Sequence, residues 1–161
     1  MFASTDACVP RNAAIKEQTL VVVWVWSEAA LGFALPQRDA EGVPRPRKTR
    51  ILALSRGNVT VTRLDEFTLR LRPDDGFLPR EMDRLSRGPS QPLRPGDGVR
   101  LSDMTATVDE VVDGWRPQTV TFRFSAPLES PHFLWMRGDG MRLVGWTPPK
   151  VGETVVVPAL L

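Results

Sequence analysis

The side chains that most often carry chemistry are few and scattered in this chain. Cys8 is the only cysteine and His132 the only histidine. A single cysteine excludes an intrachain disulfide and a zinc site built on several thiolates. The two residues lie near opposite ends of the sequence, so the spacing does not favour a Cys–His catalytic pair. We therefore expect no metal site and no cofactor.

Two pairs of adjacent carboxylates are the remaining candidates for acid–base chemistry. They are Asp74-Asp75 and Asp109-Glu110. Adjacent residues of a strand point to opposite faces, so neither pair is expected to converge. The pattern favours turn or solvated roles for both pairs. The enzyme alternative is a hydrolase or transferase whose site is assembled from these carboxylates and His132 without a linear motif.

The familiar catalytic and phosphate-binding motifs are missing from the sequence. It contains no glycine-rich phosphate loop, no nucleophile elbow and no helical pair of metal-binding histidines. The run Gly138-Asp139-Gly140 has the wrong spacing for a dinucleotide fingerprint and is typical of a hairpin turn. These observations favour a protein without catalytic activity.

Aromatic and arginine side chains gather around that glycine turn. Trp135 and Arg137 precede it, and Arg142 and Trp146 follow it. Such side chains on a β surface stack on nucleobases or anchor a protein interface. The ordinary alternative is that the tryptophans fill the core while the arginine stems cover its edge. We keep these four residues as interface candidates and expect no nucleic-acid partner.

A second candidate surface is the basic strip formed by Arg45, Arg47, Lys48 and Arg50. The net charge of the chain is only +2, yet residues 37–100 carry 14 basic and 9 acidic side chains. The strip alternates with prolines, which is typical of an extended segment. It could contact phosphates or act as a polyproline recognition segment. The ordinary alternative is a solvated linker.

The most apolar segment covers residues 19–36. A membrane-spanning helix needs about 20 predominantly apolar residues. This segment is shorter, contains Glu28 and is rich in valine, so it predicts a buried strand over 20–26 followed by a short helix. Ser27 could cap that helix, and Pro36 is expected to end or kink it. A membrane segment and a signal-like segment are the alternatives.

Residues 58–157 alternate between apolar and polar side chains in short runs. This period of two predicts half-buried strands joined by hairpins, one of them turning at Asp113-Gly114. One or two helical turns are expected around 79–86. The predicted fold class is α+β and β-dominated, an antiparallel barrel or sandwich over 58–157 with a strand–helix–strand unit over 19–55. Residues 1–18 are expected to form a poorly ordered lead-in to a single domain over 19–161.

An ordered set of short segments resembles one group of known proteins. The segments are Thr19–Val23, Ala40–Gly42, Val59–Asp65, Thr68–Pro73, Gly76–Leu78, Pro95–Val99, Met104–Val108, Val120–Phe124, Ala126–Ser130, Thr147–Pro149 and Val151–Glu153. In this order they resemble the C-terminal extramembrane β-rich region of large, uncharacterised multi-pass membrane proteins of bacteria. The resemblance covers about residues 19–157. Because those proteins carry many spanning helices upstream, it implies that this chain is a truncated, separately encoded or excised tail.

The preferred function is a non-catalytic accessory or protein-interaction domain. The resemblance implies a membrane-embedded protein partner and association with a membrane. The alternatives are the enzyme described above and a β domain that binds single-stranded nucleic acid through an exposed Trp/Arg face.

Overall fold

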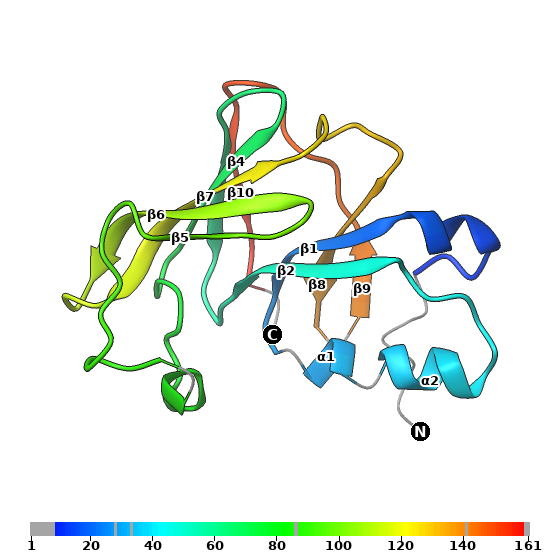
Figure 1. Ribbon diagram of the computed structural model, residues 1–161, viewed down its shortest axis with the longest axis horizontal. Helices are drawn as coiled ribbons and strands as arrows, with labels where there is room; N and C mark the ends of the chain where they lie inside the picture. The colour runs from blue at the N-terminus through cyan, green and yellow to red at the C-terminus, as the bar shows by residue number, and fades with distance from the viewer. Residues whose placement is uncertain (1–8, 28, 33, 86, 141, 160–161) are drawn as a thin grey trace. The chain divides into compact units, whose positions relative to one another are not determined.

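β-Strands dominate the computed structural model, which describes residues 9–27, 29–32, 34–85, 87–140 and 142–159 (Figure 1). The strands form a four-stranded and a six-stranded sheet. The predicted α+β, β-dominated class is therefore confirmed, and neither sheet closes into a barrel among the described residues. The chain divides into two compact units, residues 1–54 with 129–147 and 160–161, and residues 55–128 with 148–159.

The first unit contains the four-stranded sheet, in the order β2-β1-β8-β9. Its central strand β1, Thr19–Val25, pairs in parallel with β2, Lys48–Leu54, and with β8, Phe133–Asp139. The strand β9, Arg142–Gly145, completes the sheet as an antiparallel hairpin with β8. All seven residues of β1 are buried. The valine-rich run is thus a buried strand, as predicted, because β-branched side chains suit a pleated surface.

Two short helices connect β1 to β2, as a parallel connection requires. They are α1, Ala29–Gly32, and α2, Ala34–Ala40. Pro36 does not end α2, because it lies in the first turn. Main-chain N–H groups of the first turn form no hydrogen bond within the helix, so the missing N–H of proline breaks none. Glu28, the charged residue of the apolar segment, lies outside the described residues. No helix in the described part of the chain is long and apolar enough to cross a membrane.

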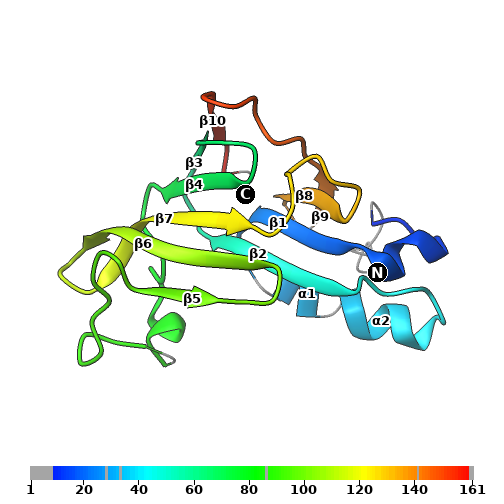
Figure 2. The same ribbon diagram turned by 45° about the horizontal axis from the view of Figure 1, so that its top comes forward.

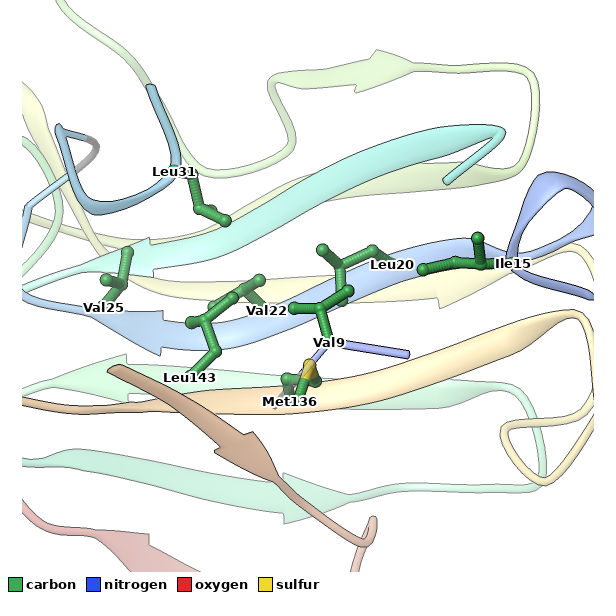
Figure 3. Close-up of a cluster of buried hydrophobic side chains, with 8 residues drawn as sticks. All are labelled: Val9, Ile15, Leu20, Val22, Val25, Leu31, Met136 and Leu143. Carbon is green, nitrogen blue, oxygen red and sulfur yellow. The ribbon is translucent and has the colours of Figure 1, made fainter. Parts of the chain in front are cut away.

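A cluster of apolar side chains fills the side of this sheet on which the helices lie (Figure 3). β1 contributes Leu20, Val22 and Val25, and the neighbouring elements contribute Leu31, Met136 and Leu143. Val9 and Ile15, from the segment before β1, belong to the same cluster. That segment contains a 3-10 helix, η1, Ala13–Glu17, whose first turn is capped by Asn12. Residues 9–18 of the expected lead-in therefore contribute side chains to the core.

A buried arginine joins three parts of the first unit. The side chain of Arg38, in α2, donates hydrogen bonds to the carbonyl oxygens of Val9, Pro10 and Pro44. Arg38 is 1% exposed. Because a buried guanidinium is stable only when its donors are bonded, these bonds fix the incoming segment and the proline-rich connection against α2.

The second unit contains the six-stranded antiparallel sheet, in the order β10-β3-β4-β7-β6-β5 (Figure 2). The strands are β3, Val59–Arg63; β4, Thr68–Pro73; β5, Gly98–Arg100; β6, Met104–Val112; β7, Arg116–Phe124; and β10, Thr154–Val157. Asp113 and Gly114 both have positive φ between β6 and β7. The predicted hairpin at this dipeptide is confirmed. The helical turn expected around 79–86 is the 3-10 helix η2, Glu81–Leu85.

The predicted alternation gives this sheet one apolar and one polar face. Val59, Val61, Leu69 and Leu71 are fully buried, and Phe122 is 5% exposed. The residues between them, mostly threonine and arginine, lie on the other face. The hairpin of residues 133–146, which the sequence assigned to this body, belongs instead to the four-stranded sheet. Its parallel pairing with β1 joins distant segments without a turn, so no local pattern predicts it.

Arg63, at the end of β3, has the same role in the second unit as Arg38 in the first. Its side chain donates to the carbonyl oxygens of Asp65, Glu66 and Pro149 at 3.0, 3.2 and 3.1 Å. Arg63 is 4% exposed. The β3–β4 turn and the segment that leads into β10 are therefore attached to one guanidinium group.

The substitution Gly138→Ala should destabilise the protein by about 1–3 kcal/mol. A Cβ at Gly138 would lie 3.0 Å from the ring of Trp24 and 3.2 Å from its carbonyl oxygen. Trp24 is fully buried and has no room to move away. The matched control is Gly145→Ala in β9, where a Cβ meets no atom within 4 Å. Equal free energies of unfolding for the two variants, measured with denaturant, would contradict this packing.

The substitution Arg63→Lys should cost about 2–4 kcal/mol, because one ammonium nitrogen cannot reach three separated carbonyl oxygens. The control is Arg123→Lys, whose side chain is 60% exposed and whose ion pair with Asp65 spans 3.4 Å. That control should change the free energy of unfolding by less than about 1 kcal/mol. If Arg63→Lys lowers the free energy of unfolding by no more than the control does, the three hydrogen bonds do not stabilise the loops.

Candidate functional site

Six of the eight predicted interface residues lie at the two edges of the four-stranded sheet, and Trp135 and Arg137 lie on its inner strand β8. Lys48 and Arg50 belong to the edge strand β2, and Arg45 and Arg47 precede it. At the opposite edge, Arg142 lies in β9 and Trp146 directly follows it. Strands β1 and β8 separate the two edges. The structure therefore does not combine the basic strip and the Trp/Arg hairpin into one site.

The basic strip is partly anchored to its own unit. Arg45 forms an ion pair of 2.7 Å with Asp39, and the main-chain N–H of Arg47 donates to the carbonyl oxygen of Gln18. Arg45 and Arg47 are exposed, whereas Lys48 and Arg50 are half-buried. Arg45 also lines a surface hollow of about 380 Å³, together with Lys16, Asp39, Gly42, Val43 and Pro44. Basic side chains along an edge strand hinder its pairing with other chains.

The tryptophans of the hairpin pack against aromatic neighbours. Trp135 lies between Phe133 and Trp146, with ring centroids 6.0 and 5.7 Å apart. Trp135 is only 7% exposed, Trp146 is half-buried and Arg142 is exposed. The side chain of Arg137 donates to the carbonyl oxygen of Gly138. Base stacking needs an exposed ring face, and Trp135 does not offer one.

The polar face of the six-stranded sheet gathers carboxylates that the sequence was expected to keep apart. Asp109 accepts a hydrogen bond of 2.6 Å from Thr121 and pairs with Arg70 at 3.3 Å. Glu110 accepts one of 2.8 Å from Thr119 and pairs with Arg72 at 2.6 Å. Thr119 and Thr121 are two residues apart on β7 and so share a face. Asp109 and Glu110 therefore lie on one face.

A β-bulge explains this correction to the sequence-based prediction. The register between β6 and β7 shifts on both sides of Glu110. A bulge sets two residues of one strand against one of its partner, which cancels the strict alternation of side chains. Neither residue is glycine, and no other sequence signal marks the bulge. Adjacent carboxylates on a strand were therefore assigned to opposite faces.

The two ion pairs line a shallow hollow of about 320 Å³, together with Thr60, Thr62 and Thr119. The four charged side chains are 28–57% exposed. Each carboxylate contacts one arginine and one threonine, so donors and acceptors alternate across the face. Such a face can form hydrogen bonds with a polar surface of another molecule.

The remaining acid–base candidates lie elsewhere. Asp75 accepts hydrogen bonds from the Ser55 hydroxyl at 2.6 Å and from the main-chain N–H of Arg56. His132 belongs to the first unit, before β8. Neither residue lines the hollow that contains Asp109 and Glu110. Among the described residues, no three His, Cys, Asp or Glu side chains are grouped to hold a metal ion.

Among the described strands, only β5 consists entirely of exposed residues, and no candidate residue was predicted on it. All three of its residues are exposed, and Val99 is 54% exposed. The carbonyl of Asp97 and the N–H of Leu101 are bonded to β6. Because bonding alternates along an antiparallel strand, the main-chain groups of Gly98 and Arg100 point away from β6. The glycine-rich turn before this strand was the available sequence signal.

No protein-family model matches this chain, and no curated protein or solved structure matches it.

Asp65, in the turn between β3 and β4, is a carboxylate whose pKa is shifted by its surroundings. Its Oδ1 accepts a hydrogen bond of 2.7 Å from the main-chain N–H of Phe67. This bond, with smaller contributions from Thr68 and Arg123, lowers the pKa of Asp65 below its ordinary value. The guanidinium of Arg123 also lies over the Phe67 ring, 5.3 Å from its centroid. The charged form of Asp65 thus stabilises the β3–β4 turn.

The stabilising effect of Asp65 should depend on pH. Because the folded pKa is lowered, this stabilisation is fully present above the ordinary pKa and is lost as the pH falls through the folded pKa. Asp65→Asn should therefore reduce the free energy of unfolding near neutral pH, and the difference from the wild type should shrink between about pH 5 and about pH 2. Denaturant unfolding of both proteins at several pH values measures this difference in the free energy of unfolding. A difference that stays constant over this range would contradict the assignment.

Proposed function

We propose that this chain is a non-catalytic interaction domain, and that an extended segment of a membrane-embedded protein partner binds along β5. The observation that carries the proposal is the exposed main chain of Gly98–Arg100 at the edge of the six-stranded sheet. An edge strand offers unpaired N–H and C=O groups to an added strand. Such strand addition requires no catalytic group.

The side chains of β5 favour an approaching strand. A Cβ at Gly98 would lie 2.6 Å from the carbonyl oxygen of Ala106, so only glycine allows β5 to pair this closely with β6. The absence of a side chain at Gly98 also leaves the outer edge without steric protection. Val99 and Leu101, 54% and 37% exposed, offer apolar contacts.

The charge near β5 indicates the chemistry of the partner segment. Arg100 is the charged residue of β5 and is exposed, whereas Arg94 and Asp97 in the turn before β5 offset each other in charge. An acidic residue in the added strand would pair with Arg100. An apolar residue next to it in the added strand would lie on the opposite face, where Val99 and Leu101 are exposed. A partner segment that is extended, partly apolar and acidic fits this edge best.

Two further observations support a binding role with a membrane protein. The carboxylates of the polar face are each engaged by arginine and threonine, which suits hydrogen bonding between surfaces better than proton transfer to a substrate. The resemblance over residues 19–157 is to extramembrane regions of multi-pass membrane proteins. It supports a membrane-embedded partner.

The test compares Arg100→Pro with Arg100→Ala. Proline removes the outward-pointing N–H of residue 100 but breaks no hydrogen bond to β6, whereas alanine removes only the side chain. Each tagged variant is used to capture proteins from detergent-solubilised membranes of the source organism. We expect the wild type to retain one integral membrane protein, Arg100→Ala to retain it in reduced amount because the ion pair is lost, and Arg100→Pro to lose it at an unchanged melting temperature.

A photo-crosslinking residue at position 99 should become attached to that partner, and one at Thr62, on β3, should not. Equal capture by the wild type and Arg100→Pro would refute strand addition. Loss of capture in both variants would indicate a side-chain contact of Arg100. If the wild type retains no integral membrane protein, the proposal of a membrane-embedded partner is wrong.

A further inference from the structure

The short helix η2 presents two large apolar side chains to solvent. Met82 is 69% exposed and Leu85 is 79% exposed, the highest values among the exposed large hydrophobic residues described. Residues three apart in a 3-10 helix lie one above the other, so both side chains project from the same side. Exposure of apolar side chains to water is unfavourable. Two such side chains next to each other on one side of an element therefore indicate a surface that contacts another molecule.

The turn that carries them is held by its own hydrogen bonds. Arg80 and Asp83 form an ion pair of 2.9 Å, and their side chains are 22% and 10% exposed. Asp83 also accepts a hydrogen bond of 3.0 Å from the main-chain N–H of Arg80. These bonds fix the turn in the conformation in which Met82 and Leu85 project into solvent.

The segment around η2 is basic. Residues 77–94 contain four arginines and two acidic residues, which leaves a net charge of +2. Asp83 is already engaged by Arg80. Arg94 is exposed, and Arg87 is half-buried with its guanidinium directed to the carbonyl oxygen of Gln91. Apolar side chains next to net positive charge complement a bilayer surface that contains anionic lipids.

We propose that η2 contacts the membrane surface, with Met82 and Leu85 entering the interface of a bilayer that contains anionic lipid. Arg87 follows η2 in the sequence and Arg94 lies further along the same connection to β5, and in this proposal both meet lipid phosphates. This contact uses side chains outside β5, and it rests on the proposed function, because the membrane-embedded partner holds the domain near the bilayer. It is a lipid contact by side chains and does not involve a spanning segment.

The size of the apolar surface favours a bilayer over a groove on a protein. Peptide helices that bind protein grooves use several anchors over two or more turns, at positions such as i, i+3, i+4 and i+7. The five residues of η2 supply two anchors. Burial of one such side chain strengthens binding about tenfold, so the pair supplies about a hundredfold. That suffices to orient a domain already held near a membrane, because the effective concentration there is high.

The experiment measures insertion of η2 into the bilayer while a tether holds the protein close to the vesicle surface. The full chain carries a C-terminal histidine tag and is tethered to vesicles by a nickel-chelating lipid. The vesicles consist of phosphatidylcholine with or without phosphatidylglycerol. An environment-sensitive fluorophore is attached at Met82→Cys in a Cys8→Ser background, and the control carries it at Val151→Cys, a position that is 60% exposed. Lipid-borne quenchers report whether each fluorophore reaches the acyl region.

We expect a blue shift and lipid quenching at position 82 on phosphatidylglycerol vesicles, and neither at position 151. Leu85→Ser should weaken the quenching at position 82 about tenfold. Val156→Ser, a matched exposed residue of the same unit, should leave it unchanged. Arg94→Gln should reduce the preference for anionic vesicles.

Several outcomes would overturn the proposal. Equal signals at positions 82 and 151, or quenching that Leu85→Ser does not change, would show that η2 does not insert. Loss of the protein partner in Met82→Ser/Leu85→Ser without any lipid signal would make η2 a protein contact. The fluorescence results do not bear on β5, because Arg100 is unchanged in all of these variants.

Discussion

The guanidinium groups of Arg38 and Arg63 are buried among main-chain carbonyl oxygens, and the loops of both units depend on them. A buried charge is costly unless every donor finds an acceptor. Arg38 finds acceptors at Val9, Pro10 and Pro44, and Arg63 finds them at Asp65, Glu66 and Pro149. In each case the carbonyl oxygens belong to loop residues that lie outside the strands and form no strand pairing. The strands form the framework, and the arginines fix the irregular chain to it.

These two arginines could not be identified from the sequence. The chain contains 18 arginines, and such an abundance is ordinarily taken as surface charge or codon bias. A buried arginine is recognised by the carbonyl oxygens around it, and those belong to distant residues. Alternation, by contrast, is a local property, and it predicted the β3–β4 and β6–β7 hairpins and their apolar faces. The valine-rich run also predicted a buried strand, because its composition suits one.

The features that the sequence did not predict share one physical cause, which is contact between distant segments or a local departure from regular pairing. The parallel pairing of β1 with β8 leaves no turn signal, so the 133–146 hairpin was assigned to the wrong sheet. The bulge at Glu110 placed two adjacent carboxylates on one face, against the alternation rule. The candidate residues on β2 and β9 were chosen for their side-chain types, and only the strand order shows that they occupy opposite edges.

The edges of the two sheets differ in their protection against further pairing. The basic residues Lys48 and Arg50 line the edge strand β2, and such side chains hinder pairing with another chain. The edge strand β5 has Gly98 in a position that only glycine can occupy beside Ala106, so a protective side chain is excluded there. A very short strand limits unwanted pairing by itself, because few hydrogen bonds can form. An edge that is short, exposed and without side-chain protection therefore suits a partner held nearby by another contact, which is the situation that we propose for this domain at a membrane surface.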